Sequence, residues 1–452
     1  MPAHLASSAE FFGSQIGGET EHPLTYTGSP WQLFTNDIKL FFRNILYLPC
    51  IFLPLFPYPT GPMDELYPSL ANLRDLALHC VLFAIQLGFL TSLPFMAYLP
   101  VSLFILYVGV VLGLNVLVCR LLNGGIPEHG LESTEDHFSR TWEPHDDEYW
   151  IFLNGICVGK HWLQNNVDRL SRTFHRPVVG VHNKTSGVVF DLVQCLIQRA
   201  LLYATPDIRE CYVLVKKALY RRGIKKVILI LHSQGGIEGG MILDWLLNEV
   251  PQDLLQNLEV YTFGCIANHF NNPYRDSTSS AAATAYSANN KVSPKILHRR
   301  AISHIEHYAN VYDFASRWGV LHYTRTMPKD RLENRFMGRV LVNPRAGHQF
   351  NQHYLGTLFP LDPTRRFTRD PEEGDFMAMN VVMGRSGGNR VEREGPMQSL
   401  YATGLMNSLE EEGSGGAPKE PGANYGSGSV TALKMWELSR LWLYRNGGSP
   451  PS

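Results

Sequence analysis

The sequence predicts an α/β protein in which helices cover both faces of a mostly parallel sheet, preceded by an apolar helical hairpin. Between residues 149 and 361, short apolar runs alternate with helical patterns. This order is typical of parallel sheets that helices cover on both sides. Further upstream, residues 76–119 contain no Asp, Glu, Lys or Arg. These two observations divide the chain of 452 residues into an apolar N-terminal part and an α/β part.

The elements of the α/β part, residues 149–361, follow one another in strand and helix order. The run KVILIL at residues 226–231 has no polar residue after its lysine, which is typical of a central strand buried on both faces. The other expected strands are 149–153, 178–181, 258–263 and 305–311. The expected helices are 161–174, 190–202, 208–220 and 236–249.

Residues 76–119 are long enough for two helices that cross a bilayer, since each crossing needs about 20 apolar residues. Pro94 and Pro100 interrupt the run, so the expected helices are 76–93 and 101–119. A hairpin leaves both of its ends on one side of the membrane. Arg74 and Arg120 lie at these ends and favour the cytosol for that side and for the α/β part. The alternative is a hairpin buried inside a soluble protein.

Charge and cysteine content restrict the function. Lys+Arg 40 and Asp+Glu 41 give a net charge of -1, so no basic surface for nucleic acid is expected. The 7 cysteines have irregular spacing and form no CxxC pair. They are therefore expected to be reduced thiols rather than disulfides or zinc ligands. Neither a metal nor a cofactor is expected.

The remaining regions flank the hairpin and the α/β part. Within the N-terminal region, 1–75, aromatic and basic residues between Trp31 and Tyr47 indicate an interfacial segment. The alternative is a loop packed on the hairpin. Residues 120–148 are a polar linker, and 276–293 a small polar insertion. The last two regions are a disordered tail, 362–429, and an amphipathic helix, 430–445, that binds either a membrane or the α/β core.

The strongest local signal is the serine in Leu-His-Ser-Gln-Gly-Gly, residues 231–236. This serine, Ser233, follows a buried strand and precedes a helix, which is the context of a nucleophile elbow. So tight a turn favours tiny residues two positions on either side of the serine. Gly235 satisfies this requirement, whereas Leu231 does not. The alternative is a serine that caps the helix.

A serine nucleophile needs a histidine base and an acid that orients it, and the order in this type of site is Ser, acid, His. Asp313 follows the strand at 305–311 and is the expected acid; Asp276 is the weaker candidate. His348 follows Gly347 on a loop before a short helix and is the expected base, with His353 as the alternative. For Asp313 the alternative is a cap on the next helix.

The oxyanion of an ester intermediate needs two backbone N–H donors. One is expected from Gln234, which follows the nucleophile, and the other from the turn after the first strand. There, Gly155 permits close backbone approach, so the second donor is Gly155 or Ile156. The alternative is an ordinary turn between strand and helix.

Residues 149–361 resemble the α/β-hydrolase superfamily, especially lipase-like and serine-esterase members of fungal type. The resemblance is carried by residues 152–156, 231–236, 260–264, 310–313 and 347–348. It implies a serine triad and a carboxylic-ester or lipid substrate, mapped here onto Ser233, Asp313 and His348. Leu231 departs from the family pattern.

Three functions are consistent with these residues. The first is a membrane-associated serine hydrolase that cleaves a lipid or another hydrophobic ester through an acyl-enzyme. The second is an acyltransferase with the same triad, in which an alcohol replaces water. The third is an inactive hydrolase fold that serves as a membrane scaffold, which Leu231 favours. Lipid substrate and membrane are the expected partners.

Overall fold

The computed structural model describes residues 8–13, 29–125, 130–134, 144–273, 300–326, 336–384 and 433–451. The expected insertion at 276–293 lies outside the described residues, as does the greater part of the expected tail. Asp276, the weaker acid candidate, lies there too.

The described residues form an α/β fold with a nine-stranded, mostly parallel sheet, which confirms the predicted fold class. The strand order is β2-β4-β3-β5-β6-β7-β8-β1-β9. Every pairing from β4 to β8 is parallel, whereas β2 and β1 pair antiparallel with β4 and β8. The strands are β1 Ser8–Phe12, β2 Leu131–Glu132, β3 Glu148–Leu153, β4 Val178–Val181, β5 Lys226–His232, β6 Leu258–Phe263, β7 His304–Asn310, β8 Arg339–Asn343 and β9 Asn380–Met383.

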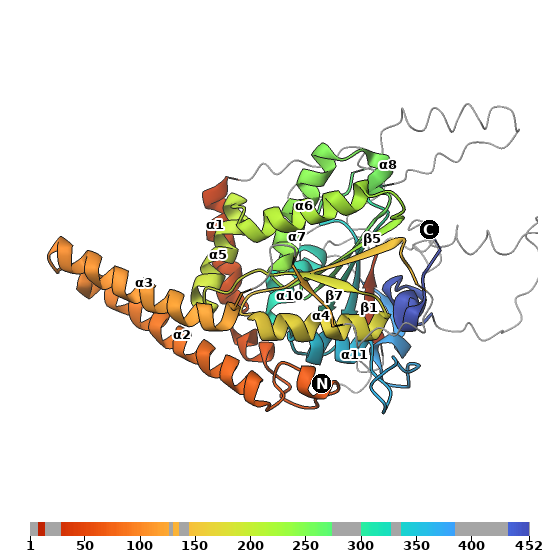
Figure 1. The fold of residues 1–452 in the computed structure, drawn as a ribbon, viewed down its shortest axis with the longest axis horizontal. Helices are drawn as coiled ribbons and strands as arrows, with labels where there is room; N and C mark the ends of the chain where they lie inside the picture. The colour runs from red at the N-terminus through yellow and green to blue at the C-terminus, as the bar shows by residue number, and fades with distance from the viewer. Residues whose placement is uncertain are drawn as a thin grey trace, which may run out of the picture.

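Strand β5 contributes to a separate hydrophobic core on each face of the sheet. Leu229 and Leu231 belong to one core and Ile228 and Ile230 to the other, because successive side chains of a strand point to opposite faces. Helices α6 Pro206–Tyr220, α7 Gly235–Glu249 and α8 Gln252–Leu255 lie on the first face, and α4 Lys160–Phe174 and α11 Gly356–Leu358 on the second (Figure 1).

The remaining elements connect these layers. Helix α1 packs beside α5, and η2 packs beside α10, in which Asp313 is the N-cap. The bounds are α1 Pro30–Arg43, η2 Ile45–Ile51, η3 Gly61–Met63, α5 Val188–Leu201, α10 Phe314–Trp318, η5 His322–Thr326, η6 Phe350–Leu355 and η7 Phe376–Ala378.

The uncharged run forms two long antiparallel helices, α2 Leu70–Met96 and α3 Val101–Asn123, that project from the body (Figure 1). Both are long and apolar enough to cross a membrane. Helix α2 begins earlier than expected, because Ser69 caps it by accepting a hydrogen bond from the N–H of Asn72. It also continues two residues past Pro94, which lies in its last turn.

Both chain ends differ from the sequence-based expectation. Strand β1 lies between β8 and β9, and β9 falls within the region expected to be a disordered tail. The expected helix at 430–445 is instead two short 3₁₀ segments, η8 Met435–Glu437 and η9 Leu441–Gly447. Their apolar side chains are buried in the same core as α4, so this segment docks on the α/β body and not on a membrane.

Candidate functional site

Ser233 occupies the tight turn between β5 and α7. Its φ is +56°, a left-handed conformation that is costly for a residue with a side chain and that persists where the surroundings enforce it. Those surroundings are close backbones: a Cβ on Gly235 would lie 2.6 Å from the carbonyl oxygen of Leu153. A Cβ on Gly155 would lie 2.5 Å from the Ser233 Cβ. The missing side chains of these two glycines therefore allow β3 and the serine turn to lie this close to each other.

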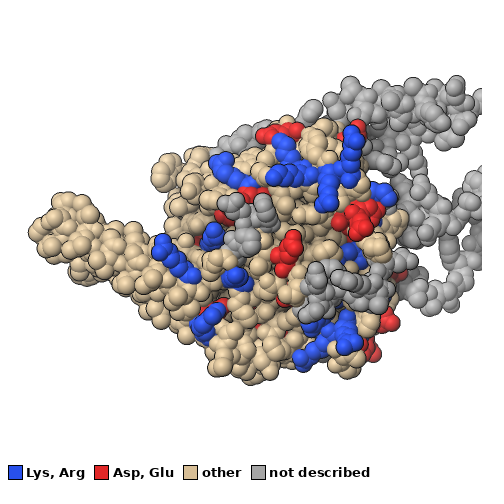
Figure 2. All heavy atoms as spheres, in the orientation of Figure 1, with Lys and Arg blue, Asp and Glu red and all other residues tan. Residues whose placement is uncertain are grey.

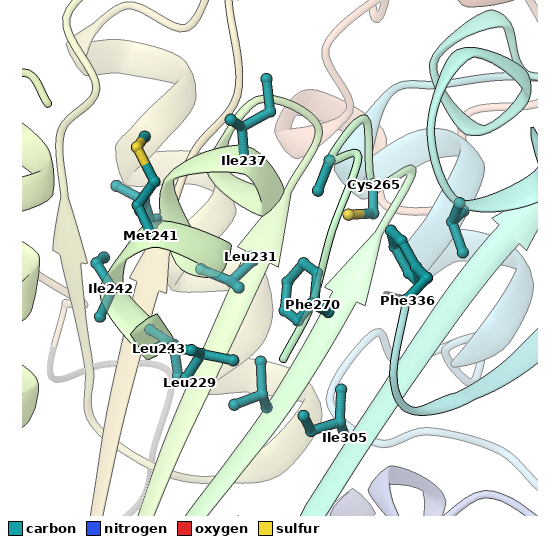
Figure 3. Close-up of a cluster of buried hydrophobic side chains, with 14 of the residues drawn as sticks. Leu229, Leu231, Ile237, Met241, Ile242, Leu243, Cys265, Phe270, Ile305 and Phe336 are labelled. Carbon is teal, nitrogen blue, oxygen red and sulfur yellow. The ribbon is translucent and has the colours of Figure 1, made fainter. Parts of the chain in front are cut away.

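Leu231, the departure from the expected small residue, is accommodated by a glycine elsewhere. Its side chain is fully buried between β5 and α7, among Ile237, Met241 and Ile242 (Figure 3). A Cβ on Gly239 of α7 would lie only 2.2 Å from the Leu231 Cδ1. The missing side chain at Gly239 makes room for Leu231, so the turn itself keeps its tight geometry.

Asp313 and His348 lie together at the carboxyl edge of the sheet, after β7 and β8. The His348 Nδ1 is 2.9 Å from the Asp313 Oδ2. An ionised carboxylate can only accept, so Nδ1 carries the hydrogen and donates it; in the neutral form of the ring, Nε2 is then the nitrogen with the lone pair. Asp313 also caps α10, accepting from the N–H groups of Ala315 and Ser316. Asp313 is therefore a helix cap, as the alternative interpretation predicted, and it also accepts a hydrogen bond from His348.

Two further hydroxyl groups donate to Asp313. Tyr354 Oη lies 2.7 Å from Oδ2 and Ser316 Oγ 2.9 Å from it. Burial alone would raise the pKa of Asp313, but the nearby His348 and these hydrogen bonds outweigh burial and hold the pKa below its ordinary value. Burial and the nearby Asp313 raise the pKa of Tyr354 well above its ordinary value, so Tyr354 stays protonated and donates.

His232, the residue before Ser233, supports the backbone of His348. Its Nε2–H donates to the His348 carbonyl oxygen at 2.9 Å, and the two rings stack with centroids 4.7 Å apart. Burial lowers the pKa of His232 to about 3, so this ring is neutral. Gly264 leaves space for the hydrogen-bonded pair of His348 and Asp313: its φ is +58°, and a Cβ there would lie 2.9 Å from the His348 ring.

His353, the alternative base, has both ring nitrogens engaged elsewhere. Its Nδ1 accepts from the N–H of Gln349 at 3.0 Å, and its Nε2 donates to the Pro54 carbonyl oxygen at 2.8 Å. Burial lowers its pKa to about 4. Of the two histidines, His348 is therefore the one that lies against the buried carboxylate.

The expected oxyanion residues also lie around Ser233. Within the described parts of the chain, the backbone N–H groups of Gly155, Ile156 and Gln234 donate to no protein atom. The Gln234 side chain is fixed by buried amides: its Oε1 accepts from Asn183 Nδ2 at 2.7 Å, and Asn154 bonds in turn to the backbone of Asn183. These amides connect the turns after β3, β4 and β5.

A charge-free segment, residues 44–63, packs on the loop that carries His348. The Ile51 carbonyl oxygen accepts from the N–H of His348, and the carbonyls of Leu55 and Pro57 accept from the side chain of Gln352. These hydrogen bonds attach the segment to the loop that carries His348 and to the residues that follow it. Its Phe52 and Phe56 rings remain 48% and 66% exposed, so it presents apolar side chains to the surroundings.

The structure thus brings Ser233, Gln234, Gly155, Ile156, Asp313 and His348 to one edge of the sheet. The Ser233 Oγ makes no hydrogen bond to His348 among the described residues, and both side chains are almost wholly buried. Sequence reasoning missed Tyr354, Ser316, His232 and the amides Asn154 and Asn183. Only Ser316, three residues after Asp313, carried a local signal, as a capping-type spacing.

No protein-family model matches the chain, and no curated protein or solved structure shows significant similarity to it.

Proposed function

We propose that this protein is a membrane-associated serine hydrolase of the α/β-hydrolase type that cleaves a carboxylic ester, with a lipid or another hydrophobic ester as substrate. The observation that carries the proposal is the buried Asp313–His348 hydrogen bond at the edge where Ser233 is held at positive φ. A histidine oriented by a carboxylate beside a strained serine is the constellation that activates a serine nucleophile.

In this mechanism, His348 Nε2 removes the proton from Ser233 as the Oγ attacks the ester carbonyl carbon. The oxyanion is stabilised by the N–H of Gln234 and by that of Gly155 or Ile156, none of which is engaged in the described structure. The His348 imidazolium then protonates the departing alcohol, and water hydrolyses the acyl-enzyme by the same steps. Asp313 orients the ring and stabilises its positive charge.

The topology supports this assignment. The proposed nucleophile follows β5, a central strand between β3 and β6. The proposed acid and base follow β7 and β8, which gives the chain order Ser, Asp, His. The missing Ser233–His348 hydrogen bond is compatible with the proposal, because such contacts are often long before substrate binds.

The scaffold alternative rested on Leu231. Because Gly239 accommodates that side chain, Leu231 no longer argues against an active serine. The acyltransferase alternative uses the same acyl-enzyme, so it is tested by offering an alcohol acceptor and analysing the products. The two apolar helices support membrane association, and the arginines at the ends of the hairpin support a cytosolic active site.

A fluorophosphonate probe, which reacts with activated serines, tests the proposal. The wild-type protein and Ser233→Ala are labelled side by side and assayed on a short soluble aryl ester. Ser303→Ala is the matched control, because Ser303 precedes β7 at the opposite, amino edge of the sheet. We expect labelling and hydrolysis to be lost only in Ser233→Ala. A folded wild-type protein that neither labels nor hydrolyses would favour the scaffold.

A further inference from the structure

The hairpin of α2 and α3 has two parts with different surroundings. Near the chain ends of the hairpin, polar side chains bond to the α/β body: Asn72 Oδ1 accepts from Trp162 Nε1 at 3.0 Å, and Asn123 Nδ2 donates to the Thr185 carbonyl at 2.9 Å. Gln86 and Asn115 bond to each other at 2.8 Å, and both donate to the Ser186 carbonyl. This part, up to Gln86 and Asn115, is the docked base.

Beyond the docked base lies the free end of the hairpin, residues 87–114. Phe89 still contacts Phe190 of α5, with ring centroids 6.4 Å apart. Farther out, the apolar side chains face the surroundings; Phe95, Tyr98 and Val101 are 72%, 91% and 74% exposed. On the face shown in Figure 2, the projecting end carries neither acidic nor basic side chains, and charged residues begin where the hairpin meets the body. The exposure of so large an apolar surface is unfavourable in water and favourable in lipid.

The free end is too short to cross a bilayer. At 1.5 Å per residue, the segment of α2 from Leu87 to Met96 is about 15 Å long, and the segment of α3 from Val101 to Leu114 is about 21 Å long. The hydrocarbon core of a bilayer is about 30 Å thick. The docked base cannot add the missing length, because moving it into lipid would bury its polar bonds and the body to which it is attached.

The turn of the hairpin is also apolar. Ala97–Pro100 contains Tyr98 as its one polar side chain, and no charged residue lies between Arg74–Asp75 and Arg120. A turn that emerged on the far side of a membrane would meet headgroups and water, where charged and polar residues are usual.

We infer that the hairpin enters a single leaflet, with Tyr98 near the middle of the bilayer and with Gln86 and Asn115 at the level of the headgroups. This inference rests on the membrane association proposed above and replaces the two complete crossings expected from helix length. The carboxyl edge of the sheet then faces the same leaflet, because the docked base bonds to Thr185 and Ser186, which follow β4 at that edge.

The insertion depth has a consequence for the substrate. A Cβ on Gly159, in the turn that contains the oxyanion candidates Gly155 and Ile156, would lie 2.8 Å from the carbonyl oxygen of Leu122 in α3. The hairpin thus contacts the turn next to Ser233. An ester whose carbonyl lies near the headgroups of the inserted leaflet has the shortest path to this edge, so we assign the substrate to lipid esters of that leaflet.

The test uses the full-length chain in sealed vesicles, with a bimane fluorophore on Tyr98→Cys or on Leu114→Cys. Lipids brominated near the end of the acyl chain or near the headgroup quench the fluorophore according to depth. We expect Tyr98→Cys to lose more emission with the deep quencher and Leu114→Cys with the shallow one. The unsubstituted chain gives the background from native thiols. The matched control is Tyr220→Cys, at an exposed position on α6, which neither lipid should quench.

The reverse order, with Leu114→Cys deep and Tyr98→Cys shallow, would overturn the inference and indicate two crossings. So would reaction of Tyr98→Cys with an impermeant maleimide enclosed in the vesicles. A chain that stays in the supernatant when vesicles are pelleted would overturn membrane association itself. Catalysis by Ser233 is independent of all these outcomes, because it is measured on a soluble ester.

Discussion

The α/β body and the hairpin differ in which kinds of side chain they bury and which they expose. In the body, apolar strands such as β5 are buried and even the charged Asp313 is enclosed by donors. In the hairpin, Leu and Val side chains are exposed and the polar Gln86 and Asn115 are buried against each other and against the body. This difference indicates that the body is suited to water and the hairpin to apolar surroundings. The two parts meet at the turns beside Ser233. The body and the hairpin should therefore respond to separate sets of substitutions.

The largest effect is expected from His348, the proposed catalytic base in the body. His348→Ala should lower kcat on a soluble ester by about 10⁶, and Asp313→Asn by about 10⁴, because the base is lost or held wrongly. His353→Ala is the matched control, since His353 lies in η6, directly after the loop that carries His348, and its ring bonds to Gln349 and Pro54 rather than to Asp313. Sedimentation with vesicles should not change. An inactive His353→Ala together with an active His348→Ala would show that the base is His353.

The converse change removes the free end of the hairpin. Replacing residues 87–114 by a short Gly-Ser linker should release the protein from vesicles, because apolar burial supplies the binding at about 25 cal/mol per Å². Activity on a soluble ester should remain, since the docked base that supports the turns after β3 and β4 is kept. A truncated protein that still sediments after a high-salt wash would mean that another surface, such as Phe52 and Phe56, also holds the membrane.

A smaller effect tests the fit of Leu231 within the body. Gly239→Ala should lower the free energy of unfolding by about 1–3 kcal/mol, because the new methyl group overlaps Leu231. In the Leu231→Ala background the same change should be neutral or stabilising, since space is available and Ala favours a helix. Denaturant titration of the four proteins gives the coupling energy. Additive effects would mean that Gly239 does not accommodate Leu231.

The last prediction concerns a pH dependence of stability. Burial raises the pKa of Glu65 from 4.5 to about 7, against the N–H groups of Asn351 and Gln352 that bond to it. Between these two values the folded protein holds a proton that the unfolded chain has lost. The stability contributed by protonated Glu65 is therefore complete below about pH 4.5 and is lost as the pH rises through about 7.

The slope from Glu65 can reach about 1.4 kcal/mol per pH unit. Glu65→Gln should remove it, whereas Glu210→Gln, on an exposed part of α6, should leave it unchanged. Unfolding free energies measured from pH 4 to pH 8 decide between these outcomes. Parallel curves for the wild type and Glu65→Gln would show that Glu65 does not contribute to the pH dependence.

Local sequence patterns predicted most of the parallel core. Strands β4 and β6 have the expected bounds, and β3, β5 and β7 differ by one residue at an end or at both. Strands β4 and β5 are almost wholly apolar, because burial on both faces leaves little choice of residue. Strands β1, β2, β8 and β9 were not predicted. The edge strands β2 and β9 have only two and four residues, and the bounds of a short edge strand depend on which partner it meets. Strands β1 and β8 lie inside the sheet but have only five residues each.

Local patterns along the chain were enough to predict five of the parallel strands, the uncharged hairpin and the selection of Ser233, Asp313 and His348 as candidates, since each depends on periodicity, composition or spacing. The folded structure was needed to show that His348 and not His353 meets Asp313, that Gly239 makes room for Leu231, and that Tyr354 donates to the carboxylate. It also decided how much of the hairpin is free to enter lipid. These are contacts between residues far apart in the chain, and no local pattern encodes a distance that the packing of whole helices and strands sets.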